Sequence, residues 1–397
     1  MVNPQFDATK SHGGDGFRAE PVAAAGFPRA PFMPGPNWFR VELLASRIFV
    51  PHGSVETHYL VSPALRGNAL NDPERRPIVV YLPDRYRKNP HERFPVIYLL
   101  HGAMTDIGAW LLRDGNPTSL LETMDSVIAE QGDAILVMID AWTSVGGSQY
   151  LNSAAIGRYQ DYVVDDVVEW TDSKFRTVKS ASGRAIFGHS SGGFGAWMAC
   201  TRRPGVFGAL GMLAADCLFE GVYLKTLGPA VRRLREAYNG DMQFFWSTHG
   251  SAEIGDEHGK RIYQPQDGHG RRWNPEDAAI YDQHMLASAF AGIDSAPRYL
   301  FEPETGRIND EVWAMWAALD PARTADSYTE ELAQLKHISI GAARQDEFFA
   351  DNGAAALSAL LTSDGVPHVR LTGDGTHEPG ELFREQFQVL LRSTVGQ

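Results

Sequence analysis

Residues 183–197 read GRAIFGHSSGGFGAW, an apolar run that leads into two serines flanked by glycines and then into a helix-like sequence. Gly188, Ser190 and Gly192 fit the pattern Gly-x-Ser-x-Gly at this junction. A strand that turns tightly into a helix forces the central serine into a strained backbone conformation, and side chains at the flanking positions would collide. The stretch therefore predicts a serine presented at the end of a buried strand, and Ser190 is the candidate nucleophile.

Other apolar runs predict the sheet around this turn. The runs at residues 96–100, 134–139 and 184–187 are largely apolar, as is typical of strands buried on both faces, and a helical pattern covers residues 159–175. Further strand-like runs lie at residues 47–50, 56–61, 77–82, 209–214, 337–340 and 368–371, and a last helical pattern lies at 381–391. Alternating strands and helices predict an α/β fold with a mostly parallel central sheet and helices on both faces.

Two segments fall outside this alternation. Residues 1–39 carry scattered Gly and Pro and predict an extended N-terminal arm, so that residues 40–397 form the α/β domain. Residues 216–310 are rich in aromatic and turn residues, and we expect an insertion over the C-terminal edge of the sheet that could act as a lid. Apolar side chains in the arm predict that part of it docks, so the arm and the insertion are candidate surfaces for a homo-oligomer.

The composition of the chain limits which binding partners and which cellular compartment are expected. The formal net charge of −13 argues against nucleic acid or an anionic membrane surface as the main partner. The first residues lack a secretory signal pattern and no segment reaches about 18 uninterrupted apolar residues, which predicts a cytoplasmic protein. Cys200 and Cys217 are expected to be unpaired core thiols rather than a disulfide.

A serine hydroxyl is a poor nucleophile near neutral pH and needs a base oriented by a carboxylate. Two later strand-like runs each end beside a suitable residue. Asp346 follows the run at 337–340, and His377 follows the run at 368–371. The order serine, acid, histidine is the one expected for this kind of turn. We therefore predict a catalytic triad of Ser190, Asp346 and His377, which requires no metal or other cofactor.

Other residues could fill two of these roles. Glu347 is adjacent to Asp346, and Asp374 lies near His377, although Asp374 would come from the wrong strand for the acid. Four further histidines lie in the insertion, where no strand end fixes them, and a solvated or structural role is favoured for them: His249, His258, His269 and His284.

The oxyanion of a tetrahedral intermediate needs two N–H donors. One is expected from Ser191, which follows the nucleophile at the start of a helix. The second should come from the loop after an earlier strand, where the sequence continues from Leu99 as LLHGAM. Ala103 is the preferred donor there, and Met104 is the next candidate.

Taken in order, these stretches resemble the esterase branch of the α/β-hydrolases, which includes enterochelin esterases, feruloyl and acetylxylan esterases, S-formylglutathione hydrolases and mycolyltransferases. The resemblance covers about residues 40–395 and is carried by SPAL at 62–65, VVYLPDRY at 79–86, FPVIYLLHG at 94–102, SQYLNS at 148–153, YQDYVVDD at 159–166, the serine turn, FEPETG at 301–306, VWAMW at 312–316, Asp320-Pro321, QDEF at 345–348 and GTH at 375–377. It implies the α/β-hydrolase fold and the same triad. The family often has Gly-Gly-His at the base, where this chain has Gly-Thr-His377.

Three side chains are candidates for substrate contact. Trp110 and Trp142 lie in loops that should emerge at the same edge of the sheet as Ser190, and His189 precedes the nucleophile. Large aromatic residues at such positions can equally belong to the core. The expected function is hydrolysis of a small-molecule carboxylic ester through an acyl-enzyme. Acyl transfer to an alcohol and a non-catalytic binding or scaffold role are the alternatives.

Overall fold

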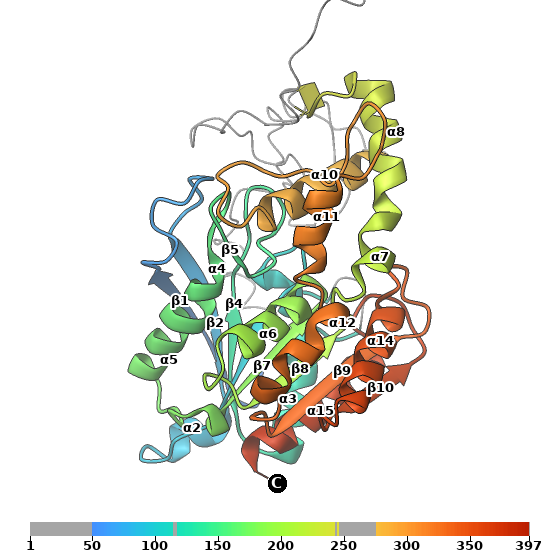
Figure 1. Ribbon diagram of the computed structural model, residues 1–397. Helices are drawn as coiled ribbons and strands as arrows, with labels where there is room; N and C mark the ends of the chain where they lie inside the picture. The colour runs from blue at the N-terminus through green and yellow to red at the C-terminus, as the bar shows by residue number, and fades with distance from the viewer. Residues whose placement is uncertain (1–49, 114–116, 243, 246–274, 397) are drawn as a thin grey trace, which may run out of the picture.

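The computed structural model describes residues 50–113, 117–242, 244–245 and 275–396 of the chain (Figure 1). The predicted N-terminal arm at residues 1–39 therefore lies outside the described residues, as does most of the strand-like run at 47–50.

The centre of the molecule is a twisted, mostly parallel sheet. In the described residues it has eight strands in the order β1-β2-β4-β3-β7-β8-β9-β10. β1 and β2 pair antiparallel, as do β2 and β4, and all the other neighbours are parallel. The bounds are β1 Ser54–Val61, β2 Arg75–Leu82, β3 Val96–Leu100, β4 Ile135–Ile139, β7 Arg184–His189, β8 Ala209–Leu213, β9 His337–Ala343 and β10 Val369–Gly373. The fold class predicted from the apolar runs is confirmed.

Of the three strands predicted to be buried on both faces, β3 and β4 are buried throughout, and β7 is buried except at its two ends. All residues of β3, β4 and β8 are buried, because helices cover both faces of the sheet at its centre. Pairing of β3 with β7 sets Leu100 opposite Gly188, so the loops that follow these two strands leave the sheet side by side. This register brings the loop at Ala103 next to the turn at Ser190.

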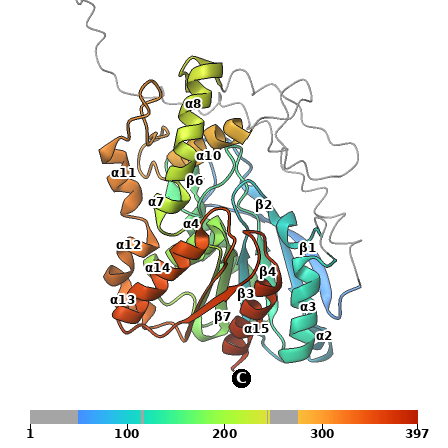
Figure 2. The same ribbon diagram turned by 90° about the vertical axis from the view of Figure 1, so that its right-hand side faces the viewer.

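Helices pack on the two faces of this sheet (Figures 1 and 2). α15 packs on α3 and against β8 and β9, whereas α6 packs on β7 and β8 from the other face. The bounds of these and neighbouring segments are α2 Asp84–Lys88, η1 Ile107–Trp110, α3 Leu120–Gln131, α4 Tyr159–Asp161, η2 Tyr162–Val167, α5 Val168–Lys174, η3 Ala181–Gly183, α6 Ser191–Arg202, α14 Ala350–Ser363 and α15 Glu381–Val395. In the described part of the chain, no helix is long and apolar enough to cross a membrane.

The described part of the predicted insertion is helical rather than irregular. It contains α7 Phe219–Val222, η4 Leu224–Thr226, α8 Leu227–Tyr238 and α10 Pro275–Ala289, and it is followed by α11 Asp310–Ala317, α12 Pro321–Thr324, η5 Ala325–Tyr328 and α13 Thr329–Leu332. α8 buries Ala230, Val231, Leu234 and Tyr238 along one stripe and packs on α10. This helix was not predicted, although charged residues between the apolar positions are typical of a surface helix. Figure 1 shows α8 and α10 beyond the edge of the sheet where the parallel strands end.

Candidate active site

Ser190 occupies a strained turn between β7 and α6. Its backbone angles are φ 56° and ψ −125°, a conformation that a residue with a side chain rarely adopts. The Ser190 N–H donates to the Leu213 carbonyl at 2.9 Å, and the Ser190 carbonyl accepts from Gly193 N–H at 2.8 Å. The turn is therefore held from both sides, by β8 and by the first turn of α6.

The flanking glycines are required by the space around this turn. A Cβ atom at Gly188 would lie 2.0 Å from the Gly192 carbonyl oxygen, and one at Gly192 would lie 2.1 Å from the Leu100 carbonyl oxygen. Both obstructions are backbone atoms, so a side-chain rotation would not relieve them. The start of α6 is thus packed directly on the ends of β7 and β3.

Asp346 and His377 come together at the ends of the next strands. His377 Nδ1 lies 2.9 Å from Asp346 Oδ2, and both side chains are buried. Asp346 Oδ1 accepts from the N–H groups of Phe348 at 2.8 Å and Ala350 at 3.3 Å. The Asp346 carboxylate is held by N–H groups of its own loop. It faces the imidazole of His377, which was predicted as its partner in the triad.

The electrostatics of this pair favour a charged carboxylate and a basic imidazole. Burial acts to raise the pKa of Asp346, but the hydrogen bond and charge of His377 and the two backbone donors outweigh it and hold that pKa below its usual range. Burial acts to lower the pKa of His377, but Asp346, Asp216 and Glu378 outweigh it and raise that pKa above its ordinary value. His377 is therefore a stronger base than a free imidazole.

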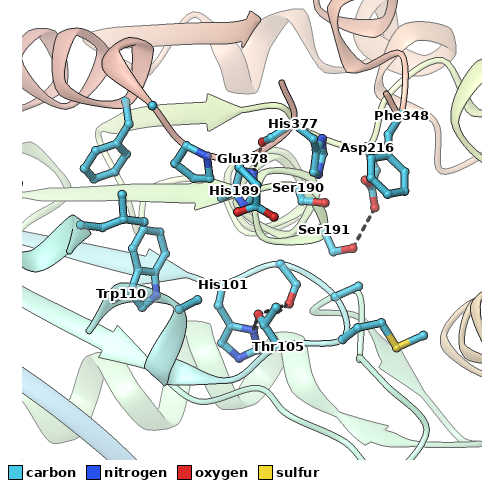
Figure 3. Close-up of a pocket in the computed structure, with 18 of the residues that line it drawn as sticks. His101, Thr105, Trp110, His189, Ser190, Ser191, Asp216, Phe348, His377 and Glu378 are labelled. Carbon is cyan, nitrogen blue, oxygen red and sulfur yellow. Dashed lines mark hydrogen bonds between the residues drawn. The ribbon is translucent and has the colours of Figure 1, made fainter. Parts of the chain in front are cut away.

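Ser190 and His377 line one cavity of about 500 Å³ (Figure 3). Within the described residues, the Ser190 hydroxyl makes no hydrogen bond to the imidazole in this conformation; in unliganded sites such contacts commonly tighten when substrate binds. The cavity walls come from the loops after β3, β7, β8, β9 and β10 and from the predicted insertion, which contributes Tyr223, Thr226, Asp282 and Met285.

Two neighbours position His377 through its backbone. Glu347 Oε2 accepts from the His377 N–H at 2.9 Å, and His189 Nε2 donates to the His377 carbonyl at 2.9 Å. Burial lowers the pKa of His189 to about 3, so this imidazole is neutral at physiological pH. The sequence offers Glu347 only as an alternative acid; its hydrogen bond to the His377 backbone forms because the loops after β9 and β10 pack side by side.

Two backbone N–H groups are available for an oxyanion. Among the described residues, the N–H groups of Ala103 and Ser191 have no hydrogen-bond acceptor, and both residues line the cavity. The expectation for Met104 is wrong. Met104 has φ 56°, and its N–H donates to the Gly146 carbonyl at 2.7 Å, so that donor is already used.

His101 fixes the loop that carries Ala103. Its Nε2 accepts from the Ala141 N–H at 3.0 Å, which leaves the proton on Nδ1 to donate to the Gly102 carbonyl at 2.8 Å. The Tyr150 hydroxyl donates to the His101 carbonyl at 2.7 Å. This loop is consequently tied to the end of β4 and to the segment before α4.

The two candidate tryptophans have different surroundings. Trp110 lies on the cavity wall and packs on Phe187 and Phe383. Trp142 is buried and does not line this cavity, so its predicted substrate contact is not supported. Its carbonyl accepts from the buried Arg76 at 2.8 Å, which holds the loop against β2 and away from Ser190. His189 does line the cavity, and its contact with substrate stays a prediction.

The other residues considered for the acid and base roles lie apart from the Asp346 and His377 pair. Asp374 is exposed and pairs with Arg344 at 2.6 Å. His284 is buried, lies 2.7 Å from the Tyr299 hydroxyl through Nδ1, and is not on the cavity wall. His249, His258 and His269 lie outside the described residues.

One cavity residue was not anticipated from the sequence. Asp216 is buried, follows β8 and contacts the Ser191 hydroxyl. Its position after a buried strand, on the strand next to β7, is the signal that could have found it, since the carboxyl ends of parallel strands share one edge.

Residues 68–364 match the family model described as "Putative esterase", a range that contains Ser190 and Asp346 and ends before His377. Over 143 residues the chain is 29% identical to an endo-1,4-beta-xylanase/feruloyl esterase of Xylanibacter ruminicola, which covers 34% of this chain and 19% of that protein. The chain spans about a quarter or less of the length of the first curated relatives it matches.

Two solved structures from Staphylococcus aureus share the fold. A fluorophosphonate-binding serine hydrolase is 18% identical with a TM-score of 0.51, covering 86% of this chain and 98% of its own. An S-formylglutathione hydrolase is 16% identical with a TM-score of 0.51, covering 86% of this chain and 99% of its own. The chain thus has the α/β-hydrolase fold that the resemblance implied.

The close approach at the serine turn predicts a steric effect on stability. Gly188→Ala should lower the free energy of unfolding by about 3 kcal/mol, the upper end of the usual cost of overpacking, because the new methyl group would displace the first turn of α6. Gly228→Ala is the matched control, since a Cβ there meets nothing within 4 Å and lies in α8. It should be neutral or stabilise by about 0.5–1 kcal/mol. Urea unfolding of the two variants measures both effects, and equal stabilities would contradict the prediction.

Proposed function

The chain belongs to the esterase family whose model matches residues 68–364, and from this we propose that it hydrolyses the carboxylic ester of a small molecule through an acyl-enzyme formed on Ser190. The observation that carries the proposal is the buried pair of His377 and Asp346 at the cavity that Ser190 also lines. The two unused N–H groups of Ala103 and Ser191 support it.

In the first half of the proposed reaction, His377 Nε2 takes the proton of the Ser190 hydroxyl while Oγ attacks the ester carbonyl carbon. The carbonyl oxygen becomes an oxyanion, and the N–H groups of Ala103 and Ser191 donate to it. When the intermediate collapses, the bond to the alcohol oxygen breaks and His377 returns the proton to that oxygen. The alcohol leaves, and the acyl group remains on Ser190.

In the second half, His377 takes a proton from water, which attacks the acyl carbonyl carbon. Collapse of this second intermediate returns the proton to Ser190 Oγ and releases the carboxylic acid. One water is consumed for each ester cleaved. Asp346 stabilises the imidazolium in both halves, and its hydrogen bond to Nδ1 leaves Nε2 as the atom that exchanges the proton.

The cavity supports a small organic ester as the substrate. Its volume of about 500 Å³ lies within the range typical of small-molecule sites. Its lining includes these large apolar and aromatic side chains: Trp110, Leu120, Tyr223, Met285, Phe348 and Phe383. Apolar walls of this kind suit an aryl or alkyl group on either side of the ester bond.

A fluorophosphonate probe tests the nucleophile. We expect the probe to label the wild-type protein and Ser191→Ala, because both retain the Ser190 hydroxyl, but not Ser190→Ala. Hydrolysis of p-nitrophenyl esters by Ser190→Ala should fall by at least about 10³-fold. Labelling and turnover that persist in Ser190→Ala would overturn the proposal.

The raised pKa of His377 predicts the pH profile. His377 must be neutral to accept the serine proton, so kcat/KM should fall as the pH drops through a midpoint above the free-imidazole pKa of about 6.5. Glu378→Gln should move this midpoint to lower pH, because it removes a negative charge that stabilises the imidazolium. Asp374→Asn is the control: the residue is on the same loop but exposed and paired with Arg344, and the midpoint should not move. A wild-type midpoint at or below the free-imidazole pKa of about 6.5 would contradict this assignment.

A further inference from the structure

Asp216 is the acceptor at the centre of a buried hydrogen-bond network beside Ser190. Its Oδ2 accepts from the Ser191 hydroxyl at 2.9 Å (Figure 3). It also accepts from the Tyr223 hydroxyl at 2.9 Å and from Gln149 Nε2 at 3.2 Å. All four residues are buried, and all four line the active-site cavity. The mechanism described above uses the backbone of Ser191 but assigns nothing to its side chain or to Asp216.

The network joins segments that are distant in the sequence. Asp216 follows β8, Ser191 begins α6, Tyr223 follows α7, and Gln149 lies between β4 and α4. Placing a carboxylate in such a site is unfavourable unless donors compensate it. Burial raises the pKa of Asp216, and the three donors oppose that rise. The carboxylate therefore keeps its donors in place, because moving any of them would leave it less well compensated.

We propose that Asp216 is a positioning residue for ester hydrolysis, which holds the Ser191 hydroxyl and thereby aims the Ser191 N–H at the oxyanion. This inference rests on the proposed function and assigns a purpose to the second serine of the Gly-x-Ser-x-Gly turn. Asp216 acts through Ser191 and not on the substrate.

The sequence at the start of α6 explains why the hydrogen bond between the Ser191 hydroxyl and Asp216 matters. Ser191 is followed by Gly192 and Gly193, so it alone among the first three residues of α6 has a side chain that can be held by its surroundings. The preceding Ser190 is in a strained conformation, which persists only when neighbouring contacts impose it. The Ser191 to Asp216 hydrogen bond adds a side-chain contact between the start of α6 and the segment after β8, beside the backbone bond from Ser190 N–H to the Leu213 carbonyl.

Asp216 has a second, separable effect through its charge. The charged or titratable groups around His377 include Asp346 and Glu347 from the loop after β9, His189 from β7, Glu378 from its own loop, and Asp216 from the loop after β8. Lys225 of η4 adds a positive charge that interacts with Asp216, Asp346 and Glu347. The negative charge of Asp216 favours the imidazolium. Removing that charge should make His377 easier to deprotonate, whereas removing the Ser191 hydroxyl should not.

Three variants separate the effect of the Ser191 to Asp216 hydrogen bond from the effect of the Asp216 charge. They are Ser191→Ala, Asp216→Asn and the double variant. Concentrations of active sites come from fluorophosphonate titration, so misfolded protein is not counted. We expect Ser191→Ala to lower kcat about tenfold with KM within twofold, because the N–H remains but is less well aimed. Asp216→Asn should lower kcat by a similar factor and also move the acidic midpoint of kcat/KM to lower pH, whereas Ser191→Ala should leave the midpoint in place. The double variant should be no slower than Asp216→Asn, because both changes break one hydrogen bond.

Asp125→Asn is the matched control, because Asp125 is another buried carboxylate with several donors, including the Tyr81 hydroxyl at 2.7 Å, and it does not line the cavity. It should lower stability but leave kcat per active site and the midpoint unchanged. Unchanged kcat in Ser191→Ala, or a double variant whose loss is the product of the single losses, would overturn the proposal. If Asp216→Asn does not fold, Ser191→Ala alone decides. A wild type that the probe does not label would instead refute the proposed function.

Discussion

The direct contact between the first turn of α6 and the ends of β7 and β3 is the constraint on which the rest of the site depends. Backbone atoms of Gly188, Gly192 and Leu100 approach so closely that a single methyl group would overlap them. This contact leaves Ser190 in a backbone conformation that places its side chain at the open edge of the sheet. It also fixes the register of β3 beside β7, which brings the Ala103 loop to the same point.

Parallel strands then assemble the other groups at this edge. The loops after β8, β9 and β10 deliver Asp216, Asp346 and His377, in strand order away from Ser190. Several carboxylates around one imidazole raise its pKa, and two of them, Asp346 and Asp216, accept hydrogen bonds from neighbouring donors. In this site, backbone N–H groups and hydroxyls of short loops donate hydrogen bonds to Asp346 and Asp216. These carboxylates in turn stabilise the imidazolium form of His377.

Residues placed by the end of a strand were predictable, and those placed by contacts between loops were not. Ser190, Asp346 and His377 each follow a strand-like run; the structure brings Ser190 and His377 to one cavity, and Asp346 is hydrogen-bonded to His377. Met104 and Trp142 also follow such runs, but a hydrogen bond to Gly146 removes the first as a donor and the buried Arg76 draws the second away from the cavity. Glu347 and His189 hold the His377 backbone only because the ends of three strands meet.

The sequence by itself determined the sheet, the turn and the order of serine, acid and histidine, because each depends on local patterns of apolar residues and glycines. Tertiary structure decided which of the neighbouring groups remain available for chemistry. An N–H or a carboxylate is available only if no other segment already binds it, and that depends on segments up to 188 residues away, as the contact of His189 with His377 shows. The adjacent serines illustrate both: the pattern identified Ser190, and only the fold gave the Ser191 hydroxyl its partner in Asp216.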